Sequence, residues 1–113
     1  MVEKVGFDLT GKVALVTGAG RGLGAQISED ILRAGGSVML AARKRPDKLM
    51  RQLNEKYPGR AEHCTLSVEN EQEWIEAVDA CVATFQGLDV LVNNTGIEVQ
   101  ALLTDRTLED FRN

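Results

Sequence analysis

The chain has 113 residues, of which 43% are hydrophobic and 27% charged, a composition typical of one globular domain. Its formal net charge of −4 argues against nucleic acid or an anionic membrane surface as the main partner. No apolar run approaches the roughly 20 residues of a membrane-spanning helix, and no export signal is visible at the N-terminus. Cys64 and Cys81 form no disulfide framework, so we expect a cytoplasmic chain with reduced thiols.

Four short segments have the patterns of β-strands. Three of them are continuous apolar runs, as in strands that are buried on both faces of a parallel sheet, whereas the third in chain order alternates and suits a sheet edge. The four predicted strands are 13–16, 38–42, 63–68 and 90–92.

Helical spacing of apolar residues separates these strands. The inner faces are predicted to carry Leu23, Ile27 and Ile31 in the first helix, Leu49, Leu53 and Tyr57 in the second, and Trp74, Val78, Cys81, Val82 and Phe85 in the third. Gly35–Gly36, Pro58–Gly59 and Gly87 are expected to end these helices. Asn70 is the expected N-cap of the third helix, and 107–113 resembles the start of a further one.

This alternation predicts an α/β fold in which the strands lie parallel and the crossovers are right-handed. The expected element order is β-α-β-α-β-α-β, and the expected strand order is 3-2-1-4. The fourth strand then lies beside the first, at the switch point where open α/β sheets bind ligands.

The segment Thr17–Gly24 is rich in glycine and joins the first strand to the first helix. In such a segment Gly18 permits a tight turn, Gly22 lets phosphates approach the backbone, and Gly24 lets the helix pack close to the sheet. The helix N-terminus then offers N–H groups to a pyrophosphate. We therefore interpret 1–113 as a Rossmann-type dinucleotide-binding half-domain. A P-loop is excluded because no Gly-Lys-Ser/Thr follows, and a methyltransferase stays open as an alternative.

The end of the second strand discriminates between the two nicotinamide dinucleotides. An acidic residue here would bind the ribose 2′-hydroxyl of NAD, whereas an arginine accommodates the 2′-phosphate of NADP. Ala42 leaves space, and Arg43 is a forked donor that suits a phosphate; Arg21 in the glycine segment could reach the same group. These residues predict NADP in preference to NAD. Lys44 and Arg45 either strengthen the local field or belong to a solvated basic turn.

Three segments resemble the short-chain dehydrogenase/reductase family. They are Leu9–Thr17, the Thr-Gly-xxx-Gly-x-Gly run Thr17–Gly24, and Asn93-Asn94-Thr95-Gly96, which is similar to the family's Asn-Asn-Ala-Gly signature. The resemblance extends from about Leu9 to Asn113.

The resemblance implies a set of cofactor-binding residues. They are Gly18, Gly20, Arg21, Gly22, Leu23, Gly24, Arg43, Ser67, Val68, Asn94, Thr95 and Gly96. In the family Asn94 and Gly96 would approach the adenosine ribose and the middle of the cofactor, and Asn93 would stabilise the sheet. Ser67-Val68 stands where the family has an Asp-Val pair that contacts adenine, a departure that would weaken the adenine contact.

The resemblance also implies that the catalytic Ser, Tyr and Lys lie beyond Asn113, because family members are considerably longer. Tyr57 has no Lys four residues later, and His63, Cys64 and Cys81 are better explained as structural residues. We therefore expect no catalytic or metal-binding residues in this truncated chain.

The expected function is that of an NADP(H)-dependent oxidoreductase that transfers hydride between an alcohol and a ketone. Its complete form would act on a small-molecule carbonyl or alcohol, form a homo-oligomer, and bind neither nucleic acid nor membrane. Two alternatives are a non-catalytic nucleotide-binding module and a fragment that associates through the open edge of its fourth strand.

That open edge and an uncovered sheet face predict that the chain alone is marginally stable or self-associates. Analytical ultracentrifugation and calorimetry measure both properties. A monodisperse monomer that melts cooperatively would contradict this prediction.

Overall fold

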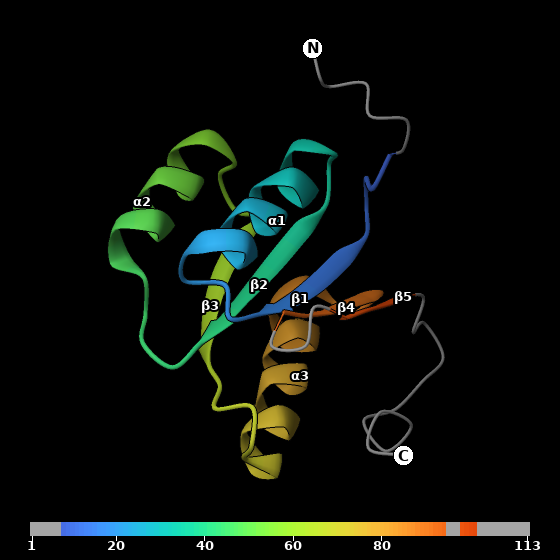
Figure 1. Ribbon diagram of the computed structural model, residues 1–113. Coiled ribbons are helices and arrows are strands. Elements are labelled where there is room, and N and C mark those ends of the chain that lie inside the picture. Colours follow the sequence, from blue (N-terminus) through green and yellow to red (C-terminus); the bar gives the residue numbers. More distant parts are fainter. Residues whose placement is uncertain (1–7, 95–97, 102–113) are drawn as a thin grey trace.

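The computed structural model describes residues 8–94 and 98–101, in which helices and strands alternate as far as β4 (Figure 1). The elements are β1 (Val13–Thr17), α1 (Gly22–Arg33), β2 (Ser37–Ala42), α2 (Asp47–Lys56), β3 (Ala61–Thr65), α3 (Glu71–Phe85), β4 (Val90–Asn93) and β5 (Glu98–Ala101). The helix expected at 107–113 lies outside the described residues. No helix in the described part of the chain is long and apolar enough to cross a membrane.

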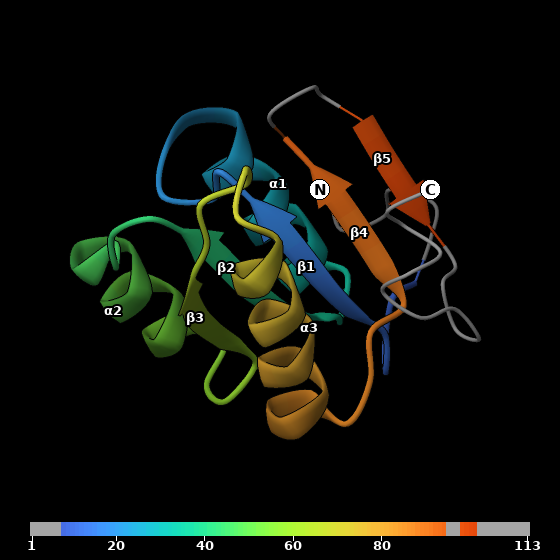
Figure 2. The same ribbon diagram turned by 90° about the horizontal axis from the view of Figure 1, so that it is seen from below.

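The strands form one sheet in the order β3-β2-β1-β4-β5. β1 is parallel to both β2 and β4, and β2 is parallel to β3, so the predicted parallel order 3-2-1-4 is confirmed. β3 lies at an edge, as its alternating pattern indicated (Figure 2). Its bounds differ from the predicted 63–68. β3 begins at Ala61, which pairs with Val38 of β2, and it ends at Thr65.

The prediction that β4 presents an unpaired edge is wrong. β5 pairs with β4 in the antiparallel direction, with Val92 opposite Val99. This strand satisfies backbone N–H and C=O groups that a bare β4 would leave open. The outer edge of the sheet on this side therefore belongs to β5.

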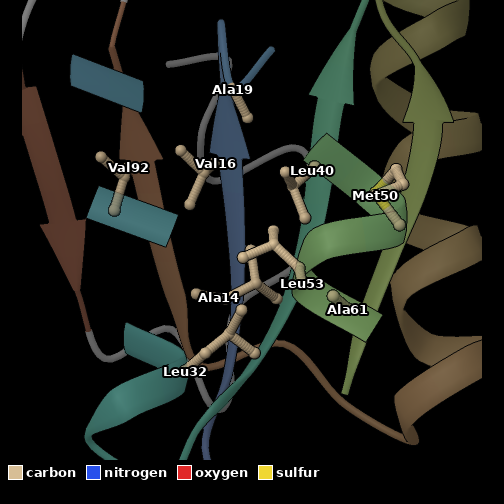
Figure 3. Close-up of a cluster of buried hydrophobic side chains, with 10 residues drawn as sticks. Ala14, Val16, Ala19, Leu32, Leu40, Met50, Leu53, Ala61 and Val92 are labelled. Carbon is tan, nitrogen blue, oxygen red and sulfur yellow. The ribbon is translucent and has the colours of Figure 1, made fainter. Parts of the chain in front are cut away.

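Helices cover both faces of the sheet: α1 and α2 lie on one face and α3 on the other (Figure 1). β1 contributes to both cores, because its side chains alternate between the faces. On the α1/α2 face, Ala14 and Val16 pack in one buried cluster with Leu32, Leu40, Met50 and Leu53 (Figure 3). On the α3 face, Val13 and Leu15 pack with Met39, Leu66, Ala77 and Cys81.

Two apolar residues that were predicted on inner helix faces are exposed instead. Leu23 keeps 51% of its surface exposed and Val82 keeps 47%. The buried positions of α1 are Gly24, Ser28 and Leu32, and those of α3 are Ala77 and Cys81. Several of these buried positions carry small side chains, which let the helix approach the sheet closely, whereas the predicted Ile27, Ile31, Trp74 and Phe85 are partly buried and pack against the cores.

The helix ends agree in part with the predicted caps. α1 ends at Arg33, and Gly35 follows the C-cap Ala34 with φ +103° and an N–H that donates to Leu32 O at 3.0 Å, which agrees with the predicted glycine stop. α3 ends differently, since Gln86 rather than Gly87 takes the left-handed conformation, with φ 65°. At the other end of α3, Asn70 Oδ1 accepts the N–H of Glu73 at 3.1 Å, which confirms the predicted N-cap.

Asn70→Ala removes this cap and leaves the Glu73 N–H without its acceptor. We expect the variant to lose about 1 kcal/mol of unfolding free energy, measured by urea denaturation. Asn70→Asp retains an acceptor oxygen and serves as the control, so an equal loss in both variants would contradict the capping role.

Candidate nucleotide-binding site

The turn from β1 into α1 depends on two glycines with left-handed backbone. Both Gly18 and Gly22 have φ +60°, a conformation that side chains other than glycine rarely adopt. A Cβ on Gly22 would meet nothing within 4 Å, so space is open above the first residue of α1. The first N–H groups of a helix have no partner within the helix and can face an anion there.

Gly24 is required for a different reason, because it packs against the turn itself. A Cβ on this residue would overlap the carbonyl oxygen of Gly18 and lie 2.8 Å from its carbonyl carbon. It would also lie 3.0 Å from Ala19 Cα. Gly20 is less constrained, since its Cβ would stand 3.8 Å from both Ala42 and Pro46, an ordinary contact distance.

A buried hydroxyl joins this turn to the end of β4. Thr17 is fully buried, and its Oγ1 accepts the N–H of Asn94 at 2.9 Å. Asn94 Nδ2 in turn lies 3.4 Å from Gly18 O. The structure therefore brings together the two sequence segments that were predicted to share a site. The neighbouring candidates Thr95 and Gly96 lie outside the described residues.

Thr17 was absent from the predicted site, although the sequence carried a signal for it. It is a residue with a hydroxyl group, and it stands directly after the apolar run Val13–Val16. A buried hydroxyl needs hydrogen-bond partners, and its position at the carboxyl end of a central strand limits where they can be. Val92 O and Asn93 Oδ1, each 3.4 Å away, are within reach of its proton.

A cavity of about 560 Å³ opens beside the glycine turn. It is lined by Gly18, Gly20, Arg21, Ala42, Arg43, Lys44, Arg45, Pro46, Leu66 and Val68. The structure thus gathers residues from the exits of β1, β2 and β3 into one place, including both arginines of the predicted phosphate site. Arg21 and Arg43 are exposed, whereas Arg45 forms an ion pair with Asp47 at 3.0 Å.

Ser67 lies between the lining residues Leu66 and Val68 but is not among the described residues that line the cavity. Two carboxylates take its donors: Glu73 Oε1 accepts its N–H at 2.6 Å, and Glu69 Oε1 accepts its hydroxyl at 2.8 Å. The Ser67 hydrogen bond is also the main reason why the pKa of Glu69 is lowered. The loop is held further by Trp74, whose Nε1 donates to Val68 O at 2.8 Å.

The two cysteines and the histidine lie in surroundings that suit a structural role rather than a catalytic one. Burial raises the pKa of the Cys64 thiol to about 11 and that of the Cys81 thiol to about 12, so neither is a ready thiolate. His63 Nε2 contacts Ala42 O at 3.2 Å, across the β2–β3 pair. In residues 8–94 and 98–101 no three His, Cys, Asp or Glu side chains are grouped to hold a metal ion.

A parallel 3-2-1-4 sheet with a glycine-rich turn at its switch point defines a Rossmann-type nucleotide-binding domain. Comparison with known families specifies the class further. The family model for short chain dehydrogenases matches residues 12–113, and the chain belongs to this family.

Individual relatives agree with this assignment. The chain is 34% identical over 108 residues to short chain dehydrogenase mdpC of Emericella nidulans, a match that covers 93% of this chain and 40% of that protein. It is 36% identical over 105 residues to elsinochrome reductase 1 of Elsinoe fawcettii, covering 91% of this chain and 39% of that protein. The chain thus spans about two fifths of the length of these relatives.

Solved structures show the same fold. A hydroxysteroid dehydrogenase from Escherichia coli superposes with a TM-score of 0.70 at 30% identity, over 76% of this chain and 37% of that one. The C-domain of a bacterial malonyl-CoA reductase, solved with NADP, gives a TM-score of 0.66 at 30% identity, over 74% of this chain and 14% of that one.

Gly24→Ala tests the close contact between α1 and the glycine turn. The added methyl group meets the backbone of Gly18 and Ala19, so we expect a loss of about 1–3 kcal/mol of unfolding free energy, measured by urea denaturation. Gly87→Ala is the matched control, because a Cβ there meets nothing within 4 Å. Equal stability of the two variants would show that α1 does not need this approach.

Proposed function

We propose that this chain is the cofactor-binding part of an NADP(H)-dependent oxidoreductase that transfers hydride between the nicotinamide and an alcohol or carbonyl compound. Membership of the short chain dehydrogenase family supports the reaction class. The names of two relatives, a dehydrogenase and a reductase, agree with it. The substrate would be a small molecule, and the complete enzyme a cytoplasmic homo-oligomer.

The proposed preference for NADP depends on the residues at the C-terminal end of β2. Ala42 ends this strand without a carboxylate that could bind a free ribose 2′-hydroxyl, and Arg43 follows it. Arg43 and Arg21 line the same cavity from two different loops. Two arginines that line one cavity beside a dinucleotide turn suit the 2′-phosphate, which NADP has and NAD lacks.

The other candidate residues fit the rest of the cofactor. The open backbone at Gly22 and the N-terminus of α1 would hold the pyrophosphate, with Gly18, Gly20, Leu23 and Gly24 shaping the turn. Asn94, Thr95 and Gly96 would approach the ribose and the middle of the cofactor, and Ser67 and Val68 the base.

The bound cofactor supplies or accepts the hydride, and this chain's own residues bind and orient it. Protonation of the developing alkoxide requires a positioned acid. We propose that this acid lies in the part of the relatives' length that the chain does not span. The non-catalytic module would bind the same nucleotide without turnover, even when joined to such a part.

Arg43→Ser tests the proposed cofactor preference. Loss of a charge-assisted hydrogen bond to phosphate is expected to weaken NADP⁺ binding about tenfold to a hundredfold. NAD⁺ binding should stay unchanged, because NAD⁺ carries no 2′-phosphate. Isothermal titration calorimetry measures both affinities.

Arg51→Ser is the matched control, since Arg51 is exposed on α2 and is not among the described residues that line the cavity. It removes the same charge elsewhere on the surface. An equal effect of the two substitutions on NADP⁺ would contradict a direct contact between Arg43 and the phosphate. Absence of binding to either dinucleotide would overturn the proposed function.

A further inference from the structure

One side of α3 is apolar but belongs to neither core. Ile75, Val78 and Val82 recur at spacings of three and four residues, so they lie along one side of the helix. Ile75 and Val78 are only partly buried, and Val82 keeps 47% of its surface exposed. None of the three is part of the hydrophobic clusters that the described residues form. These three residues form the α3 flank.

The α3 flank faces the side of the sheet on which β4 lies. The core-facing positions of α3 are Ala77 and Cys81, and the flank is turned from them by about 110°, since successive residues of a helix are about 100° apart. α3 runs from the exit of β3 to the start of β4, and in a right-handed helix with this direction that rotation leads toward β4. Figure 2 shows β4 and β5 beside α3, and no helix of the described chain lies across them on this face.

The α3 flank is too small to hold a second copy of the chain by itself. Stable interfaces between proteins bury about 800 Å² on each partner, far more than three partly exposed side chains supply. A segment of the same chain needs less contact area, because its tether gives it an effective concentration in the millimolar range. The occupant of the flank is therefore expected within this chain.

Residues 107–113 have a pattern that is complementary to the flank. In the helix whose start this segment resembles, Leu108, Phe111 and Arg112 share one side, and the two acidic residues between them lie elsewhere on the helix. α3 has acidic residues but no Lys or Arg, and Asp79 lies next to the flank. An apolar pair with an arginine beside it thus matches an apolar flank with a carboxylate beside it.

The chain is long enough to bring this segment to the flank. β5 ends at Ala101, which pairs with Val90 at the start of β4. Neighbouring strands lie about 4.8 Å apart, and packed helices about 8–10 Å apart. Residues 102–106 span up to about 17 Å when they are extended, so they can carry 107–113 from β5 to the space beside α3.

We propose that residues 107–113 dock as a helix on the α3 flank, with Leu108 and Phe111 against its apolar side chains and Arg112 near Asp79. The docked segment covers apolar surface that would otherwise be available for self-association. Docking does not depend on the nucleotide, because the flank lies on α3 and contributes nothing to the cavity lining among the described residues.

Amide hydrogen exchange of the unmodified chain, followed by NMR, tests the docking directly. A helix as short as 107–113 is not stable in water without tertiary contacts, so an undocked segment exchanges at the rate of an unfolded chain. Docking should slow the exchange of its amides by about tenfold or more. The slowing should be equal at low and high protein concentration, because the flank and the segment belong to one molecule.

Val82→Ser tests whether the α3 flank is the surface that holds the segment. Valine and serine have similar helix propensities, so the substitution changes mainly the apolar contact. We expect it to raise the unfolding equilibrium constant about fivefold. Urea denaturation followed by the fluorescence of Trp74, the only tryptophan of the chain, measures this constant.

The same substitution should have almost no effect in a chain that already carries Leu108→Ser and Phe111→Ser, because the contact is then absent. Leu23→Ser is the matched control. Leu23 is the other large apolar residue that the structure shows as exposed, with 51% of its surface open, and it lies on α1. Its substitution should have the same effect with and without the two changes in the segment.

Slowed exchange in 107–113 together with energetic coupling between Val82 and the segment supports the proposed docking. Exchange at the rate of an unfolded chain would overturn it. Slowing that appears only at high protein concentration would also overturn it, because the occupant would then be a second copy. Slowed exchange without coupling to Val82 would show that the segment docks elsewhere and would overturn the α3 flank as its docking surface.

Discussion

The contact between Gly24 and the carbonyl group of Gly18 is the constraint on which the site depends. It holds the first turn of α1 directly against the end of β1, with no room for a side chain between them. The helix axis then begins at the sheet's carboxyl edge, where its first N–H groups face the open space over Gly22. Leu23, the residue before this contact, keeps 51% of its surface exposed.

The parallel sheet brings the other walls of the site to the same edge. Strands that run in one direction all end on one side, so loops that are far apart in the sequence become neighbours. β2 delivers Arg43 and β3 delivers Leu66 and Val68 to one cavity. β4 delivers Asn94, which Thr17 binds from the central strand. Thr17 thus stabilises the alignment of two strand ends whose residues are 77 positions apart.

The sequence was sufficient to predict the arrangement of the parallel strands, because apolar runs and turn residues define it. It was less informative where small residues decide the packing. Gly24 and Ser28 form much of the buried face of α1, yet a hydrophobic pattern directs attention to Leu23. β5 pairs with β4 across a short connection, with Asn93 opposite Glu98, but it is only four residues long, so its sequence pattern is a weak signal. The hydrogen bonds of Ser67 were not predicted either, because the sequence does not indicate that Glu69 and Glu73 accept hydrogen bonds from its hydroxyl and its N–H.

The acidic character of the whole chain does not oppose the binding of a phosphate at this site. Charges farther apart than about 8 Å are largely screened at physiological ionic strength, so the groups that line the cavity determine the local field. Arg21 and Arg43 line it from two loops, whereas Lys56, far along α2, is paired with Glu29 at 2.9 Å. Glu69 at the β3 exit carries a negative charge that interacts with Arg43, and it accepts a hydrogen bond from the Ser67 hydroxyl. No acidic side chain is among the described residues that line the cavity, so its lining is positively charged although the chain has a net charge of −4.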